Sequence, residues 1–129
     1  MRLLLDTHIW LWSLGETKRL APRVNRELDD ASNELWLSPI SLWEALLLYA
    51  KGRIQADGNF RDWVANSVIR FREAPLTHEI VLAAHELPFA HRDPADRFLA
   101  ATAGVLGLTL VTADERLLGL GHIATLANR

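Results

Sequence analysis

The sequence has 129 residues, a length typical of one domain, and 50% of them are hydrophobic while 23% are charged. It contains no apolar run long enough for a membrane span (about 18 residues) or a secretory signal, so we expect a cytoplasmic protein without membrane association. The absence of cysteine excludes disulfides, thiolate catalysis and cysteine-bound zinc, and a net charge of −2 argues against a broad, sequence-independent grip on nucleic-acid phosphates.

Hydrophobic periodicity and helix-breaking residues divide the first half of the chain into alternating strands and helices. The predicted segments are strands at 2–6 and 34–38 and helices at 8–14, 22–30 and 41–51. Pro22 stands at the first position of its helix, where proline is tolerated, and Gly52 ends the last of these helices.

The second half continues the alternation. The predicted segments are helices at 60–71, 77–86, 93–106 and 114–120 and strands at 74–76, 109–112 and 122–126, with a loop at 88–92. Strands separated by helices indicate βαβ units and a mainly parallel sheet. We therefore expect an α/β fold with a compact parallel sheet flanked by helices. No repeat or linker divides the chain, so a single domain over 1–129 is predicted.

Four carboxylates lie at the edges of segments that the apolar pattern would bury: Asp6, Glu44, Asp96 and Asp114. Asp6 and Asp114 follow the carboxyl ends of predicted strands, whereas Glu44 and Asp96 fall in the first turns of predicted helices. In open parallel sheets, ligands bind beyond the carboxyl ends of the strands, where the following helices begin. We expect the four acids to meet at this rim, where their charges repel one another unless a cation holds them.

An all-oxygen set of ligands favours Mg²⁺ or Mn²⁺ over zinc. Magnesium typically binds one or two carboxylates and keeps water molecules, which leaves room for the phosphate oxygens of a substrate. One such ion, or two about 4 Å apart, can activate a water and stabilise a leaving oxygen. The implied chemistry is metal-assisted hydrolysis of a phosphodiester.

Each acid, taken singly, also has an explanation as a helix cap. Ser41 and Glu44 have the spacing of a capping box. Asp93 is placed to cap a helix whose first turn holds Asp96, which would interact favourably with the helix dipole. The other two acids likewise stand between a strand and a helix. Caps alone do not explain four like charges on one rim.

Four sequence blocks carry a family resemblance. They are LLDTHIWLW at 4–12, SPISLWE at 38–44 with KGRI at 51–54, HRDPADRFLAATA at 91–103, and LVTAD at 110–114. In this order they resemble the PIN domain family, and specifically the VapC-type toxins of prokaryotic type II toxin–antitoxin systems. One block alone is a weak signal, but together they span nearly the whole chain.

The resemblance implies a PIN-like α/β/α sandwich with a metal pocket formed by Asp6, Glu44, Asp96 and Asp114. It implies a Mg²⁺- or Mn²⁺-dependent endoribonuclease that hydrolyses structured cellular RNA, such as transfer or ribosomal RNA. It also implies a homodimer and a cognate antitoxin, commonly a DNA-binding protein, that blocks the pocket. We expect Asp6 and Asp96 to bind the metal most directly.

Neighbouring residues are candidates for supporting roles. Thr112 is placed to orient an acidic ligand through a hydrogen bond, or is simply a strand-end threonine. Asp93 is a fifth acid with either a capping or a pocket role. Arg92 and Arg97 flank Asp96 and suit an anionic substrate, with surface ion pairs as the alternative.

The aromatic residues are divided between the core and a possible partner surface. We interpret His8 as a packed residue of an apolar helix, and Trp36 as part of the core. The other tryptophans are candidates for the core or for an apolar partner groove: Trp10, Trp12, Trp43 and Trp63. We hypothesise that an antitoxin segment lies near Trp10 and Trp43.

Other enzyme classes with a strand-end aspartate fit less well. A haloacid-dehalogenase phosphatase needs Asp-x-Asp after the first strand, but here His8 takes the place of the second acid. A phospho-receiver domain needs a lysine late in the chain, and Lys51 is the last one. The alternative is a catalytically inactive PIN-like module that binds RNA or protein, and the intact set of four acids argues against it.

Overall fold

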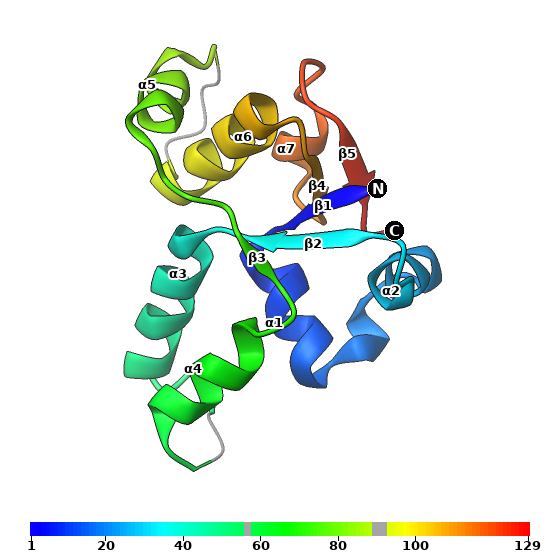
Figure 1. Cartoon of the computed structure of the whole chain (residues 1–129), viewed down its shortest axis with the longest axis vertical. Helices are drawn as coiled ribbons and strands as arrows, with labels where there is room; N and C mark the ends of the chain where they lie inside the picture. The colour runs from blue at the N-terminus through cyan, green and yellow to red at the C-terminus, as the bar shows by residue number, and fades with distance from the viewer. Residues whose placement is uncertain (56–57, 89–92) are drawn as a thin grey trace.

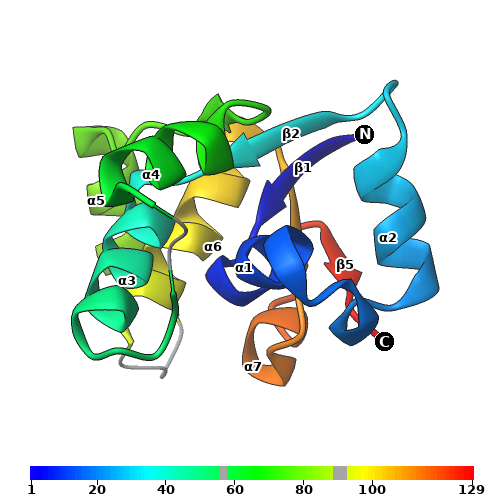
Figure 2. The same ribbon diagram turned by 90° about the horizontal axis from the view of Figure 1, so that it is seen from below.

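The computed structural model describes residues 1–55, 58–88 and 93–129, which form a five-stranded sheet with helices on both faces (Figures 1 and 2). The strand order is β3-β2-β1-β4-β5, and every pairing is parallel. The strands are β1 (Arg2–Leu5), β2 (Glu34–Leu37), β3 (Arg72–Glu73), β4 (Thr109–Thr112) and β5 (Thr125–Ala127). The predicted α/β/α sandwich is confirmed.

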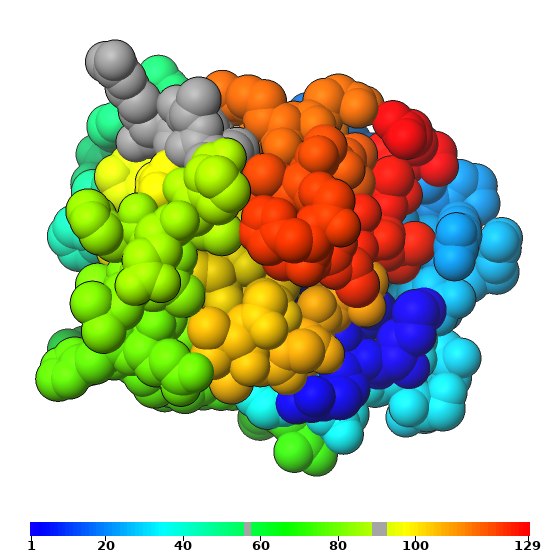
Figure 3. All heavy atoms as spheres, turned by 90° about the horizontal axis from the view of Figure 1, so that it is seen from above, coloured from blue at the N-terminus to red at the C-terminus, as the bar shows by residue number. Residues whose placement is uncertain are grey.

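The helices enclose the sheet in two layers. Their bounds are α1 (Thr7–Gly15), α2 (Pro22–Asp29), α3 (Pro39–Ala50), α4 (Phe60–Val68), α5 (His78–Glu86), α6 (Pro94–Leu106) and α7 (Glu115–Leu118), with a 3₁₀ turn η1 (Thr17–Arg19). On the face opposite α1 and α2, α5 and the segment after β4 lie on either side of α6 (Figure 3). Among the described residues, no helix has the length and apolar character of a membrane span.

The leucine run of β1 forms the centre of the core. Leu3, Leu4 and Leu5 have no exposed surface. Leu3 and Leu5 pack with residues of α1 to α4, whereas Leu4 packs with residues of α6 and α7. Because successive side chains of a strand point to opposite faces, a continuous apolar run indicates a strand covered on both sides. Asp6 directly follows this buried run, so the rigid centre of the sheet determines its position.

Some predicted bounds are wrong. The strand predicted at 74–76 lies two residues earlier, at Arg72–Glu73, and only the Ala74 N–H continues its pairing, donating to Leu37 O at 2.9 Å. Both residues of β3 are charged and exposed, so the apolar pattern pointed to the buried Ala74 instead. The helix predicted at 60–71 ends at Val68, and β5 begins three residues later than predicted. By contrast, β4 has the predicted bounds. Most of the predicted loop at 88–92 lies outside the described residues.

Candidate active site

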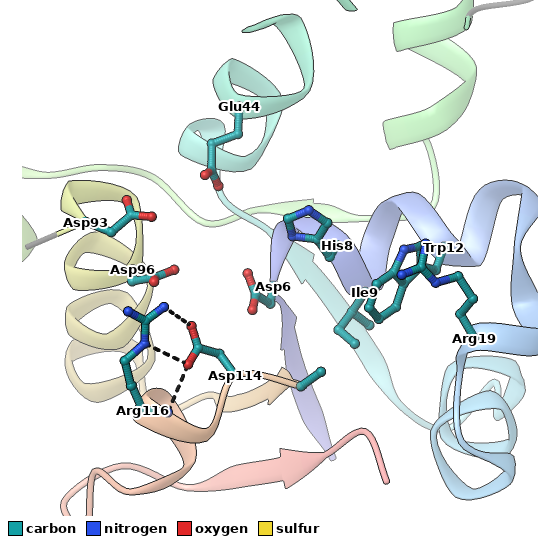
Figure 4. A pocket seen from close by; sticks show the side chains of 11 residues that line it. Asp6, His8, Ile9, Trp12, Arg19, Glu44, Asp93, Asp96, Asp114 and Arg116 are labelled. Atoms are coloured by element: carbon teal, nitrogen blue, oxygen red, sulfur yellow. Dashed lines mark hydrogen bonds and ion pairs between the residues drawn. The ribbon is translucent and has the colours of Figure 1, made fainter. Parts of the chain in front are cut away.

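Five carboxylates from four segments of the chain line one cavity of about 460 Å³ (Figure 4). They are Asp6, Glu44, Asp93, Asp96 and Asp114. Because the sheet is parallel, the carboxyl ends of β1 and β4 lie at the same edge, and Asp6 and Asp114 follow these two strands. The structure thus brings together the four acids expected at the rim and adds Asp93 to them.

Asp6 is fixed by hydrogen bonds on both carboxylate oxygens. The Thr7 N–H donates to Oδ1 at 2.7 Å, which makes Asp6 the cap of α1, and the Thr112 hydroxyl donates to Oδ2 at 2.6 Å. Thr112 is fully buried at the end of β4. Burial raises the pKa of the Asp6 carboxyl, while these two hydrogen bonds and the nearby His8 oppose the rise. Thr112 makes the contact expected of a residue that orients an acidic ligand.

Asp114 caps α7 and binds an arginine that sequence reasoning missed. The Arg116 backbone N–H donates to Asp114 Oδ1 at 2.9 Å, and its guanidinium donates to both oxygens, at 3.2 and 3.1 Å. The Asp114 N–H in turn donates to the Thr112 hydroxyl at 3.0 Å. Contact with Asp114, together with the charges of Asp96 and Asp93, raises the pKa of Arg116. Arg116 therefore balances part of the negative charge of the cavity. In the sequence, the sign of this contact is that Arg116 stands two residues after Asp114, an acid placed to cap a helix.

Glu44 does not belong to a capping box. The cap of α3 is Ser38, whose hydroxyl accepts from the Ile40 N–H at 3.1 Å, so α3 begins two residues earlier than predicted. Glu44 therefore lies in the second turn, where its carboxylate accepts a hydrogen bond from the Thr7 hydroxyl. The Ser41 hydroxyl lies 2.9 Å from Thr7 Oγ1. This buried pair of hydroxyls holds Glu44 toward α1 and away from its own helix end.

The surroundings of Glu44 disfavour the charged form of its carboxyl. Burial raises the pKa of the Glu44 carboxyl, the hydrogen bond from Thr7 opposes the rise, and the charges of the neighbouring aspartates raise the pKa further. Two carboxyls of the cavity, Glu44 and Asp6, thus have raised pKa values with burial as the main cause. A bound cation would stabilise their charged forms.

The start of α6 supplies the remaining two acids. Asp93 caps the helix by accepting from the Ala95 N–H at 3.0 Å, as predicted, and it also lines the cavity. Asp96, in the first turn, is only 8% exposed. The capping and pocket roles considered for Asp93 are therefore compatible.

The donor set fits a hard divalent cation. All five acids offer only oxygen donors, which suit Mg²⁺ or Mn²⁺. Among the described residues, no group of three acidic or histidine side chains already has the geometry to enclose an ion. Magnesium typically binds one or two carboxylates directly and keeps several water molecules, so it does not require three protein ligands in contact.

Two residues chosen from the sequence have other surroundings than expected. The interpretation of His8 as a packed residue is wrong, because its side chain is exposed and lines the cavity. Arg97 does not line the cavity. Its guanidinium donates to the carbonyl oxygens of Ala84, at 2.7 and 3.1 Å, and of Leu87, at 3.1 Å, and so holds the C-terminal end of α5. Arg92 lies outside the described residues.

The tryptophans divide between interior and surface. Trp10 has no exposed surface, and its indole N–H donates to Ser67 O at 3.1 Å, so of its two proposed places it belongs to the core. That an antitoxin segment lies near Trp10 and Trp43 stays a prediction. Trp43 is 55% exposed on α3. Trp36 packs against the core but is partly exposed, with Arg2 over its ring.

Comparisons with known proteins give consistent similarities. The sequence model of the PIN domain family matches residues 3–123. Ribonuclease VapC22 of Mycobacterium tuberculosis is 33% identical over 120 residues, which cover 92% of each chain. A DNA-bound VapBC complex from Salmonella typhimurium has a TM-score of 0.74 at 18% identity, covering 100% of this chain and 99% of that chain. VapBC2 from Rickettsia felis, bound to a promoter DNA fragment, has a TM-score of 0.72 at 18% identity, covering 98% of both chains.

Proposed function

The chain belongs to the PIN domain family, and from this premise we propose that it is a divalent-metal-dependent endoribonuclease toxin inhibited by a cognate antitoxin. The observation that carries the proposal is the cavity at the carboxyl edge of the sheet, where five carboxylates from four segments meet. The relative with 33% identity is a ribonuclease, and the structural relatives are VapBC complexes.

The proposed roles carry what the resemblance implies over to the side chains that line the cavity. Asp6 and Asp96 would bind Mg²⁺ or Mn²⁺ most directly, and Glu44 and Asp114 directly or through water. When bound, the ion supplies an activated water and positive charge for the leaving oxygen. Thr112 holds Oδ2 of Asp6 in one orientation.

Glu44 is the proposed proton acceptor. Thr7 donates to its Oε1, which leaves Oε2 to accept a proton from the attacking water. A carboxyl with a raised pKa is better suited to this exchange than an ordinary surface glutamate. The water oxygen forms a bond to phosphorus, the bond from phosphorus to the leaving oxygen breaks, and the leaving oxygen takes up a proton, so one new RNA end carries a phosphate and the other a hydroxyl.

Partners are proposed on the same basis. The substrate would be a structured cellular RNA, and the antitoxin would cover the cavity. The exposed Trp43 is a candidate antitoxin contact. A homodimer and a cytoplasmic location remain expectations from the resemblance.

Cleavage of structured RNA by the purified chain tests the activity. We expect cleavage with Mg²⁺ or Mn²⁺, and a loss on the order of 10²-fold or more in Asp6→Asn and Asp96→Asn, because each change removes a charged ligand. Asp62→Asn is the matched control, since Asp62 is exposed in α4 and lies outside the cavity. Circular dichroism would verify folding. Equal cleavage by the wild type and both cavity variants would reject the mechanism, and no cleavage by the folded wild type would favour an inactive binding module.

A further inference from the structure

One side of the cavity carries planar side chains in place of acids. His8, Trp12 and Arg19 all line the cavity, on the side of Asp6 away from Asp96 and Arg116 (Figure 4). The ring centroids of His8 and Trp12 lie 5.8 Å apart, tilted by 50°, and the Arg19 guanidinium carbon lies 4.3 Å from the Trp12 ring centroid. We call these three residues the planar shelf.

Local structure explains how the planar shelf forms. His8 and Trp12 are four residues apart in α1, so they share one face of the helix. The η1 turn after α1 then brings Arg19 over the Trp12 ring. Arg19 is also held by Glu16, with Nη1 and Oε2 3.3 Å apart. The inner part of Trp12 packs against the core, which fixes the position of its ring.

The negative charge of the cavity opposes the binding of an RNA strand. Five carboxylates repel the phosphates on either side of the scissile one, even when an ion offsets part of that charge. A substrate strand therefore needs attractive contacts along the cavity walls. Aromatic rings and guanidinium planes bind unpaired bases by stacking, and arginine also binds phosphate.

We propose that the planar shelf is a subsite for the nucleotide next to the scissile phosphate, in a single-stranded segment of RNA. The base stacks against the ring and guanidinium surfaces of His8, Trp12 and Arg19, and Arg19 binds an adjacent phosphate. RNA is the occupant that this surface favours, because its ring and guanidinium planes suit stacking with bases and Arg19 suits a phosphate. The inference rests on the proposed ribonuclease function, since it places the strand relative to the bond that is cleaved.

Binding of short RNA tests the subsite separately from cleavage. The probes are fluorescein-labelled eight-nucleotide oligouridylate and oligoadenylate, titrated by anisotropy with Mg²⁺ in an Asp6→Asn background that prevents cleavage. In this background, Trp12→Leu keeps the apolar contact with the core and removes the aromatic surface. We expect it to weaken binding by about 5- to 100-fold, the range for loss of one stacked base. Arg19→Lys keeps the charge and removes the plane, and a loss of about threefold or more is expected.

Matched controls lie outside the cavity. Tyr49→Leu removes an exposed aromatic ring from α3, and Arg23→Lys makes the same change as Arg19→Lys on the surface of α2. Neither change should alter RNA binding. Melting curves with Mn²⁺, recorded in the wild-type background, should show that Trp12→Leu leaves metal binding intact.

The outcomes separate the subsite from the activity. Equal RNA binding by parent, shelf variants and controls overturns the subsite, as does the absence of binding by the parent at about 100 µM protein. Shelf variants that bind RNA normally but no longer bind the antitoxin assign the surface to the protein partner and also overturn it. Shelf-dependent binding together with a wild type that cleaves no RNA supports the subsite while the ribonuclease function fails.

Discussion

Replacing Thr112 by valine removes a buried hydroxyl that serves two neighbours and keeps the shape of the side chain. The hydroxyl donates to Asp6 Oδ2 at 2.6 Å and accepts from the Asp114 N–H at 3.0 Å. A hydrogen bond to a charged group contributes about 1.5–3 kcal/mol to stability, and a neutral one about 0.5–1.5 kcal/mol. We expect Thr112→Val to lower the free energy of unfolding by about 2–4 kcal/mol at neutral pH.

The size of this loss should depend on pH. Burial raises the pKa of Asp6, and the Thr112 hydrogen bond opposes the rise, so the variant has an even higher Asp6 pKa. A carboxyl whose folded-state pKa exceeds its unfolded value favours folding when it is protonated, and this contribution is lost as pH rises through the folded-state pKa. In the variant the loss continues to higher pH. The difference from wild type should therefore be smallest near pH 4 and largest near pH 7.

Urea unfolding followed by tryptophan fluorescence at both pH values measures the effect. Thr112→Ser is the control, because it keeps the hydroxyl and loses one buried methyl, at a cost of about 1 kcal/mol that should not vary with pH. A loss in Thr112→Val that is equal at the two pH values, or a serine variant as unstable as the valine variant, would refute the reasoning.

Three further predictions concern charge at the cavity and the role of Arg97. Millimolar Mn²⁺ should raise the melting temperature more at neutral pH than near pH 5. The reason is that the raised pKa values of Asp6 and Glu44 let protons compete with the ion at the lower pH. Equal shifts of the melting temperature at the two pH values would contradict this. Arg116→Gln should tighten Mn²⁺ binding severalfold in calorimetry, since the guanidinium occupies both oxygens of Asp114, and weaker binding would show that Arg116 does not compete with the ion. Arg97→Met should lower the free energy of unfolding by about 1–3 kcal/mol without changing Mn²⁺ affinity, and a changed affinity would give Arg97 a role at the cavity.

The sequence predicted the parts of the fold that depend on local pattern. The leucine run before Asp6 and the strand at 109–112 are recognisable in the sequence as apolar runs, because helices cover both faces of these two strands. The proline at the start of α6 and the aspartate before it also marked a helix start correctly. By contrast, β3 consists of two exposed charged residues, Arg72 and Glu73, and its pairing with β2 leaves no apolar signal.

The contacts that build the cavity were harder to predict. Glu44 receives its hydrogen bond from Thr7, 37 residues away, and the local capping-box spacing suggested a different partner. Arg97 and Arg116 are both arginines near acids in the sequence, but only the three-dimensional structure shows that one binds the end of α5 and the other binds Asp114. His8 lies on an apolar helix, yet its direction depends on where that helix sits against the sheet.

The central pairing of the sheet has a consequence for synthesis of the chain. Leu3 of β1 pairs with Thr109 of β4, and Asp6 is held by Thr112, 106 residues later in the sequence. A ribosome produces β1 before β4, so a growing chain carries Asp6 long before its partner strand exists. The proposed ribonuclease can therefore assemble its cavity only after β4 has been synthesised, and a chain that stops before β4 would be unable to cut the RNA of the ribosome that made it.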